Sequence, residues 1–465
     1  MHIGKLRSLQ RREFLRRGSA LGLAGVAAPW ALNLSAIGEV AAATSPTDYK
    51  ALVCIFLYGG NDYGNTVVPY DPDGYREYQK IRQSLATARD ALAATALTSR
   101  VPALDGSGAR QMALAPQMGG LKALFDAGKM GVLLNVGTLV QPTTLAQYKA
   151  QSVPLPPKLF SHNDQQSVWQ AANPEGATSG WGGRIGDQFL ASNANASFSC
   201  INASGNAVFI AGQQAVQYQV STAGAVAING VNKTLFGSQA CSDALRALIT
   251  APRSHWMEEE LNRVAARSIS AQSIVSGALA SLTPLATQFD TSNSLGLQLR
   301  IVAQLIAARQ SLGVARQVFF VSLGGFDLHD FLPDQHPGLL EDLSGAMASF
   351  YDATRELGVS DQVTSFTASD FGRTLSSNGD GSDHGWGSHH FVMGGAVKGG
   401  RFWGKMPAVA VNGPDDVGQG RLLPSTSVDQ LGATLASWMG VADSDLSRVV
   451  PQIGNYSQRD LGLFA

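Results

Sequence analysis

The fold is decided by the stretch Ala51-Leu52-Val53-Cys54-Ile55-Phe56-Leu57, which is apolar at every position. A strand without polar alternation is typical of a parallel sheet that is covered on both faces. The stretch lies within residues 50–58 and runs directly into Gly59-Gly60-Asn61-Asp62, a tight turn that carries a carboxylate. The sequence therefore predicts a buried strand whose carboxyl end presents Asp62.

Similar segments recur along the chain. Helices are predicted over residues 116–128, 295–311, 338–357 and 427–438, and further strands over 131–136, 317–323, 362–368 and 391–395. This order predicts an α/β fold with a mainly parallel central sheet and helices on both faces. Residues 180–285 are rich in Asn, Ser, Gly and Ala, and we interpret them as an inserted cap region within one domain that spans residues 44–465.

The first 43 residues have the pattern of an export signal. Arg11-Arg12 precede Phe14-Leu15, an apolar stretch follows over 21–34, and Ala41-Ala42-Ala43 offers a small-residue cleavage site. This predicts a twin-arginine (Tat) signal, which directs a protein that has already folded to the periplasm or the medium. The alternative is an amphipathic anchor, but the apolar stretch is shorter than the roughly 20 residues that span a bilayer. We therefore expect contact with the Tat translocase and no stable membrane anchor.

Charge and cysteine content exclude several classes of protein. The net charge is −1, and no basic run follows residue 43, so a nucleic-acid partner held by charge is not expected. The three cysteines form no CxxC pair, which excludes a thiolate zinc ribbon. Cys54 lies within the first strand, whereas Cys200 and Cys241 are free to pair or to stay apart.

Acidic residues follow several of the predicted strands. Asp62, Asp327 and Asp370 each come after a strand that is predicted to be buried, and another loop carries Asp383-His384. Because strand carboxyl ends meet at one edge of the sheet, these carboxylates would repel one another unless a cation lay between them. Asp and His without Cys suit zinc first, and also manganese, calcium or iron. The alternative for each aspartate alone is a helix cap or a turn.

Two other histidines are candidates for the same ion. His329 follows Asp327 closely, and His389 follows His384. The sequence thus predicts a metal site that draws on Asp62, Asp327, His329, Asp370, His384 and His389. The alternatives are an ordinary loop histidine for His329 and a surface residue for His389.

Several motifs resemble those of the DUF1501 family. They are Leu57-Tyr58-Gly59-Gly60-Asn61-Asp62, Ser161-His162-Asn163-Asp164-Gln165, Gly324-Gly325-Phe326-Asp327-Leu328-His329, Asp370-Phe371-Gly372-Arg373-Thr374 and Ser382-Asp383-His384-Gly385-Trp386-Gly387. These exported proteins have no assigned activity and are grouped with the alkaline phosphatase and sulfatase superfamily. The resemblance implies an alkaline phosphatase-like fold from about Tyr49 to the C-terminus.

The resemblance also implies roles for particular residues. It implies two metals and a hydroxyl nucleophile at a helix start, for which Ser161 is the candidate, with His162 and Asn163 as contacts to substrate oxygens. Arg373 is a candidate clamp for a tetrahedral anion, with a cap or salt bridge as the alternative. Phe371 departs from the pattern, because the superfamily has a histidine there, so one metal is expected to be weakly held or missing.

These observations predict an exported metal-dependent hydrolase that acts on a small-molecule or polymeric phosphate or sulfate ester. A formylglycine sulfatase is excluded, because no cysteine has the required C/S-x-P-x-R setting. The competing hypothesis is a metal-stabilised exported binding or assembly protein that kept the fold and lost the chemistry.

Overall fold

A computed structural model describes residues 48–465, so the predicted signal over residues 1–43 lies outside the described part of the chain. Within residues 48–465, none of the helices combines the length and the apolar character that crossing a bilayer requires.

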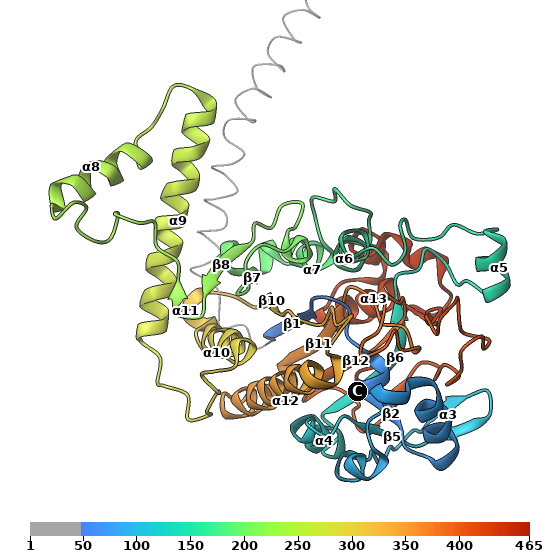
Figure 1. Ribbon diagram of the computed structural model, residues 1–465. Helices are drawn as coiled ribbons and strands as arrows, with labels where there is room; N and C mark the ends of the chain where they lie inside the picture. The colour runs from blue at the N-terminus through green and yellow to red at the C-terminus, as the bar shows by residue number, and fades with distance from the viewer. Residues whose placement is uncertain (1–47) are drawn as a thin grey trace, which may run out of the picture.

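A large mixed sheet forms the centre of the molecule (Figure 1). Its middle strands are β1 (Lys50–Leu57), β10 (Arg316–Leu323) and β11 (Val363–Ser369), with β1 parallel to both neighbours. On the β11 side follow β12 (Ser388–Gly394), which is antiparallel, and β6 (Met130–Gly137). This confirms the α/β fold with a mainly parallel sheet that the sequence predicts.

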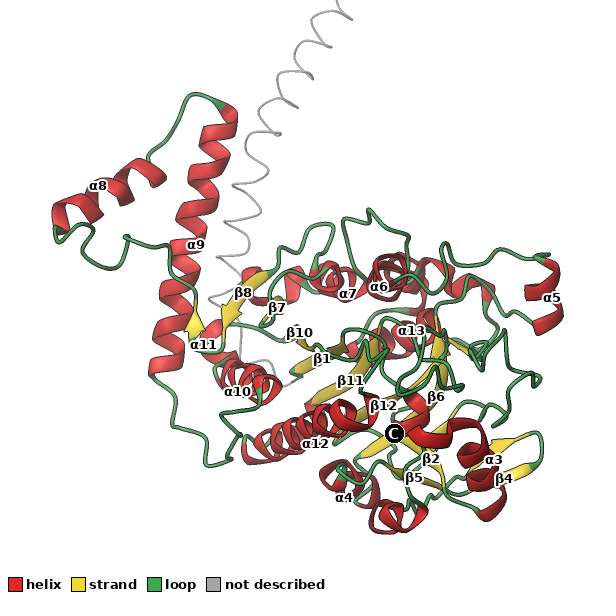
Figure 2. Cartoon of the chain, in the orientation of Figure 1, coloured by secondary structure: helices red, strands yellow, loops and turns green. Residues whose placement is uncertain are grey.

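Alternate residues of β1 pack into two separate cores. Val53 and Ile55 belong to a core with α4 (Gly119–Asp126), α10 (Ser294–Ala307) and α12 (Leu332–Glu356). The opposite face of the strand packs into a second core, which includes residues of α6 (His162–Ala171), α7 (Trp181–Gln188) and α13 (Val428–Met439). Helices therefore cover both faces of the sheet (Figure 2), which is why the strand is apolar throughout.

The region that the sequence treats as one insertion is divided in the structure. Its first part extends the main sheet, because β7 (Cys200–Asn202) pairs in parallel with β10, and β8 (Tyr218–Ser221) pairs with β7. Its second part forms an arm of α8 (Gln239–Thr250) and α9 (Trp256–Ala280), which projects from the body (Figure 1). Composition alone could not separate an edge of the sheet from the projecting arm.

The cysteines are unpaired in the structure. Cys54 and Cys200 are buried, whereas Cys241 is exposed on α8. Cys200 is the first residue of β7, and Cys241 lies in the projecting arm.

Candidate metal centre

Three imidazoles and one carboxylate meet beyond the carboxyl ends of the central strands. His162 is the first residue of α6, Asp327 and His329 lie in the loop after β10, and His384 lies between β11 and β12. The loops approach closely because two glycines leave room for them. A Cβ at Gly59 would stand 2.3 Å from the backbone nitrogen of Asp327, and one at Gly60 would stand 2.5 Å from the ring of Phe371.

His384 is at the centre of this group. Its Nε2 lies 3.0 Å from Nε2 of His162 and 2.9 Å from Nε2 of His329. The Asp327 carboxylate completes the group, with Oδ1 at 3.3 Å from Nε2 of His384 and 3.1 Å from Nε2 of His329. Its Oδ2 lies 3.4 Å from Nε2 of His162. Each of the three Nε2 atoms therefore lies within 3.4 Å of an oxygen of Asp327.

The opposite nitrogen of each imidazole has an acceptor of its own. The three pairs are His162 Nδ1 with Asp370 Oδ2 at 2.6 Å, His329 Nδ1 with Asp383 Oδ1 at 3.2 Å, and His384 Nδ1 with the Phe160 carbonyl at 2.7 Å. Because these oxygens accept hydrogen bonds, they favour a proton on Nδ1 and leave the Nε2 lone pair free. Metal-binding histidines in proteins have this arrangement, in which an outer acceptor fixes the tautomer.

The surrounding charges set different proton affinities within the group. The hydrogen bond to Asp370 raises the pKa of His162, whereas burial lowers the pKa of His384. Burial tends to raise the pKa of Asp327, but the Arg373 guanidinium at 2.6 Å outweighs it and lowers that pKa. Asp327 is therefore ionised at neutral pH and available to a cation.

The donor set fits a single divalent ion. Imidazole nitrogens and carboxylate oxygens are ligands that zinc prefers. The set whose ligand atoms all lie within 4.8 Å of one another consists of His162, Asp327 and His384, and His329 lies at its edge, next to His384 and Asp327. The side chains of Asp327 and His329 remain 45% and 41% exposed. Solvent thus reaches one side of the group.

Phe371 forms an apolar wall of the group. Its ring centroid lies 4.9 Å from that of His162 and 4.8 Å from that of His384. At the position where the resemblance implies a histidine, this chain has a ring that packs on His162 and His384.

The structure places Asp62 outside the group, contrary to the prediction that it binds metal. Its side chain is 2% exposed and accepts from Arg82 at 2.7 Å, from the Ser382 hydroxyl at 2.9 Å and from the backbone of Asn65 at 3.0 Å. Asp62 is therefore the N-cap of α2 (Tyr63–Thr66) and the partner of a buried arginine. The Arg82 guanidinium therefore neutralises the carboxylate for which we predicted a metal ion.

Two further predicted ligands also lie outside the group. Asp370 contacts it only through His162, and it also accepts from Gln166 at 2.7 Å. His389 is buried in β12, where its Nδ1 accepts from the backbone of Asn135 at 3.1 Å and its ring packs against Tyr63. Burial lowers the pKa of His389 to about 4. The prediction missed that β12 begins at Ser388, which buries His389 within the strand.

The three predicted substrate contacts, His162, Asn163 and Arg373, have different surroundings in the structure. His162 belongs to the metal group itself, and Asn163 is exposed next to it. Arg373 is 1% exposed and donates to the carbonyls of Gly59 and Ser382 as well as to Asp327. Its guanidinium is thus occupied by the protein, so the clamp that we predicted is not supported.

Ser161 precedes α6, as predicted. Its hydroxyl donates to Asp164 Oδ2 at 2.9 Å and makes no cap to the helix backbone. Its role as a nucleophile stays a prediction.

Two of the groups that hold the imidazoles were not predicted as site residues. Asp383 was recognised only as a neighbour of His384, and the Phe160 carbonyl was not recognised at all. A carboxylate next to a histidine can be read from a sequence, whereas a backbone carbonyl has no sequence signal.

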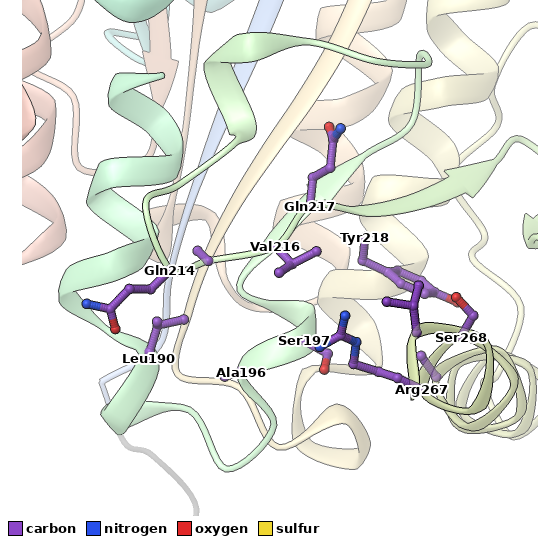
Figure 3. A pocket seen from close by; sticks show the side chains of 12 residues that line it. Leu190, Ala196, Ser197, Gln214, Val216, Gln217, Tyr218, Arg267 and Ser268 are labelled. Atoms are coloured by element: carbon purple, nitrogen blue, oxygen red, sulfur yellow. The ribbon is translucent and has the colours of Figure 1, made fainter. Parts of the chain in front are cut away.

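A separate hollow lies at the base of the arm (Figure 3). It has a volume of about 360 Å³ and lies between β8 and α9, with Val216, Tyr218 and Arg267 among its lining residues. Neither an imidazole nor a carboxylate lines it, so it offers no metal ligands.

Comparison with solved structures finds distant likenesses. Ps i-CgsB in complex with k-i-k-neocarrahexaose is 8% identical, with 86% of this chain and 74% of that chain covered and a TM-score of 0.37. The lipoteichoic acid synthase LtaP from Listeria monocytogenes is 8% identical (91% and 79% covered, TM-score 0.34). The PsFucS1 sulfatase from Pseudoalteromonas sp. is 8% identical (89% and 71% covered, TM-score 0.33). Similarity at this level supports no conclusion about activity.

Among curated proteins no match is found. The model of one family, described as a protein of unknown function (DUF1501), matches residues 49–451. The resemblance of the motifs is thereby confirmed, and the chain belongs to the DUF1501 family.

Proposed function

We propose that this protein is a metal-dependent hydrolase of phosphate or sulfate esters. The observation that carries the proposal is the convergence of three imidazole Nε2 atoms on Asp327, with each Nδ1 held by its own acceptor. The ester class rests on the motifs that resemble the alkaline phosphatase and sulfatase superfamily.

His162, His329, His384 and Asp327 would hold the ion, and zinc suits them best. A bound zinc ion polarises ester oxygens and lowers the pKa of water from about 15.7 to about 7. Asp370 and Asp383 keep two of the imidazoles in the tautomer that offers Nε2. Phe371 excludes water from one side of the group, which strengthens the charge interactions there.

Ser161 is our candidate nucleophile. It lies at the start of α6, where helix amides favour negative charge, and it directly precedes His162. The Asp164 carboxylate, which accepts its hydrogen bond, is placed to receive the hydroxyl proton. An activated water is the alternative nucleophile, and Ser161→Ala separates the two, because only the serine mechanism loses turnover.

The predicted Tat signal makes export part of the proposal. A folded protein that carries its ion is the kind of cargo for which this route exists. Replacement of Arg11 and Arg12 by lysine should retain the protein in the cytoplasm, which fractionation and blotting would measure.

The competing proposal is a metal-stabilised binding or assembly protein. Two observations favour it: Phe371 stands where the superfamily pattern has a histidine, and Arg373 is occupied by protein acceptors. The exposed side of Asp327 and His329 favours the enzyme, because a structural ion would need no open side.

Elemental analysis of protein purified without chelators is the first experiment. We expect about one equivalent of zinc, which His384→Ala loses and His255→Ala, a change at an exposed histidine before α9, retains. Hydrolysis of p-nitrophenyl phosphate or p-nitrophenyl sulfate, abolished by chelation and restored by zinc, would support the enzyme. A well-folded protein without metal would overturn the proposal, and metal without turnover of any ester would favour the binding protein.

A further inference from the structure

The Phe160 carbonyl reaches His384 through an unusual stretch of backbone. Phe160 has φ +72° and Lys158 has φ +42°, so two non-glycine residues adopt the left-handed conformation within three positions. Side chains disfavour this conformation, and it persists only where surrounding contacts enforce it. The result of the bend is the hydrogen bond of 2.7 Å from His384 Nδ1 to the Phe160 carbonyl.

Arg421 contacts both partners of that hydrogen bond. Its Nε donates to the backbone carbonyl of His384 at 2.7 Å. Its guanidinium carbon lies over the Phe160 ring, 4.9 Å from the centroid, a distance at which a cation attracts the face of an aromatic ring. One side chain therefore ties the backbone of His384 to the residue that accepts from its imidazole.

The loop that carries Arg421 is itself anchored. Val417 donates to the Arg421 carbonyl at 3.0 Å, and Leu422 accepts from the backbone of Gly387 at 2.9 Å. Because both ends of the loop are fixed, the guanidinium has a defined position from which to hold its two partners.

We propose that Arg421 and Phe160 form a clamp that holds His384 with its proton on Nδ1 and its Nε2 free for a metal ion. Both are positioning residues, since each contacts His384 and neither belongs to the group that could hold the ion. The proposal rests on the proposed metal centre, but the tautomer can be measured without metal. An outer partner of this kind changes metal affinity by about 10–100-fold when it is removed.

Arg421→Met tests the clamp, because methionine keeps much of the apolar stem and removes the guanidinium. A matched control is Arg89→Met. Arg89 lies over the Tyr70 ring at 4.7 Å and donates to the Tyr70 carbonyl at 3.1 Å through Nε, and neither residue belongs to the metal group. Both variants lose an arginine stacked on an aromatic ring, but only one is tied to His384.

Two readouts are measured on both variants and on the parent protein. The first is the zinc dissociation constant, determined by competition with a chromophoric chelator. The second is the tautomer of His384 in metal-free protein, determined from its ring ¹⁵N shifts and assigned with His384→Gln. We expect Arg421→Met to weaken zinc binding by about tenfold or more and to reduce the Nδ1–H tautomer, with Arg89→Met unchanged in both.

Phe160→Gly separates the ring from the carbonyl. Glycine keeps the carbonyl and readily adopts the positive φ, so we expect a smaller loss of zinc affinity than in Arg421→Met. An unchanged His384 tautomer in Arg421→Met, or an equal effect of Arg89→Met, would overturn the clamp. The Nδ1–H tautomer in the parent protein and its loss in Arg421→Met would support the clamp even if neither protein binds zinc. The absence of zinc binding in both proteins would overturn only the proposed function.

Discussion

Two neighbouring strands end in nearly the same sequence and have different chemistry. β1 runs into Gly59-Gly60-Asn61-Asp62, and β10 runs into Gly324-Gly325-Phe326-Asp327. Asp62 is 2% exposed and paired with Arg82, whereas Asp327 is 45% exposed and faces three imidazoles. The second glycine of each turn has a positive φ, Gly60 at +87° and Gly325 at +100°, and Gly59 has one as well, at +114°. The two turns have similar sequences, so residues distant in sequence decide the surroundings of each carboxylate.

The comparison divides the carboxyl edge into a closed half around Asp62 and an open half around Asp327. Ser382 connects them, since its hydroxyl donates to Asp62 and its carbonyl accepts from Arg373, which in turn donates to Asp327. We expect changes in the closed half to affect the free energy of unfolding and changes in the open half to affect metal binding.

The largest effect is expected for Arg82→Met in the closed half. It leaves a buried carboxylate without its cation, so the free energy of unfolding should fall by about 3–5 kcal/mol, measured by urea denaturation. Addition of Asp62→Asn should recover part of the loss, because the uncompensated charge is then removed. A loss of less than about 1 kcal/mol, typical of a surface pair, would contradict the division.

His329→Ala, in the open half, should affect zinc binding and leave the free energy of unfolding nearly unchanged. The side chain is 41% exposed, so the stability of metal-free protein should change little, whereas zinc affinity should fall by at least about 100-fold, more than for an outer-shell partner. Zinc competition and urea denaturation of the same preparations measure both quantities, and His255→Ala is the control. Unchanged zinc affinity would remove His329 from the site.

The sequence predicted the sheet well because its signals are local. The apolar run of β1 and the largely apolar runs of β6 and β10 are visible in the sequence, whereas β11 mixes apolar residues with Thr and Ser. The aspartates that follow β1, β10 and β11 lie at one edge of the sheet. The division of the aspartates could not be predicted, since it depends on Arg82, which lies at the end of α3 (Pro72–Arg82) with nothing in its surroundings to indicate burial. His162 was predicted as a substrate contact, whereas the structure places it in the group with Asp327 and His384. Its position depends on the packing of α6 against β11, a tertiary contact that the sequence does not show.

His336 allows a pH test of the closed half. It is buried, and its Nε2 lies 3.0 Å from Asn61 Oδ1. Burial is the main reason why its pKa is lowered to about 4. The Asp62 carboxylate acts in the opposite direction, whereas Arg82 and Arg373 lower the pKa further. The ordinary value is about 6.5, so the unfolded chain binds the proton more readily than the folded one. The contribution of His336 to the free energy of unfolding is therefore complete above about pH 6.5. As the pH falls toward 4, proton binding to the unfolded chain lowers the free energy of unfolding by up to about 1.4 kcal/mol per pH unit. His336→Gln should reduce that slope in urea denaturation at several pH values, and an unchanged slope would show that His336 is not responsible.

The smallest effect is expected for Asp383→Asn in the open half. In the parent protein His329 Nδ1 lies 3.2 Å from Asp383 Oδ1. Asparagine can still accept this hydrogen bond, so the substitution removes only the negative charge. We expect zinc affinity to fall by about tenfold or less, the lower end for an outer-shell partner, with no change in urea denaturation beyond about 0.5 kcal/mol. Asp380→Asn is the matched control, because Asp380 lies in the same loop and accepts from the backbone of Phe331 rather than from an imidazole. An equal loss in both variants would mean that the loop, and not the charge behind His329, sets the affinity. A loss confined to Asp383→Asn would show that the open half is tuned by carboxylates behind its histidines, while the closed half is held by an arginine in contact with its carboxylate.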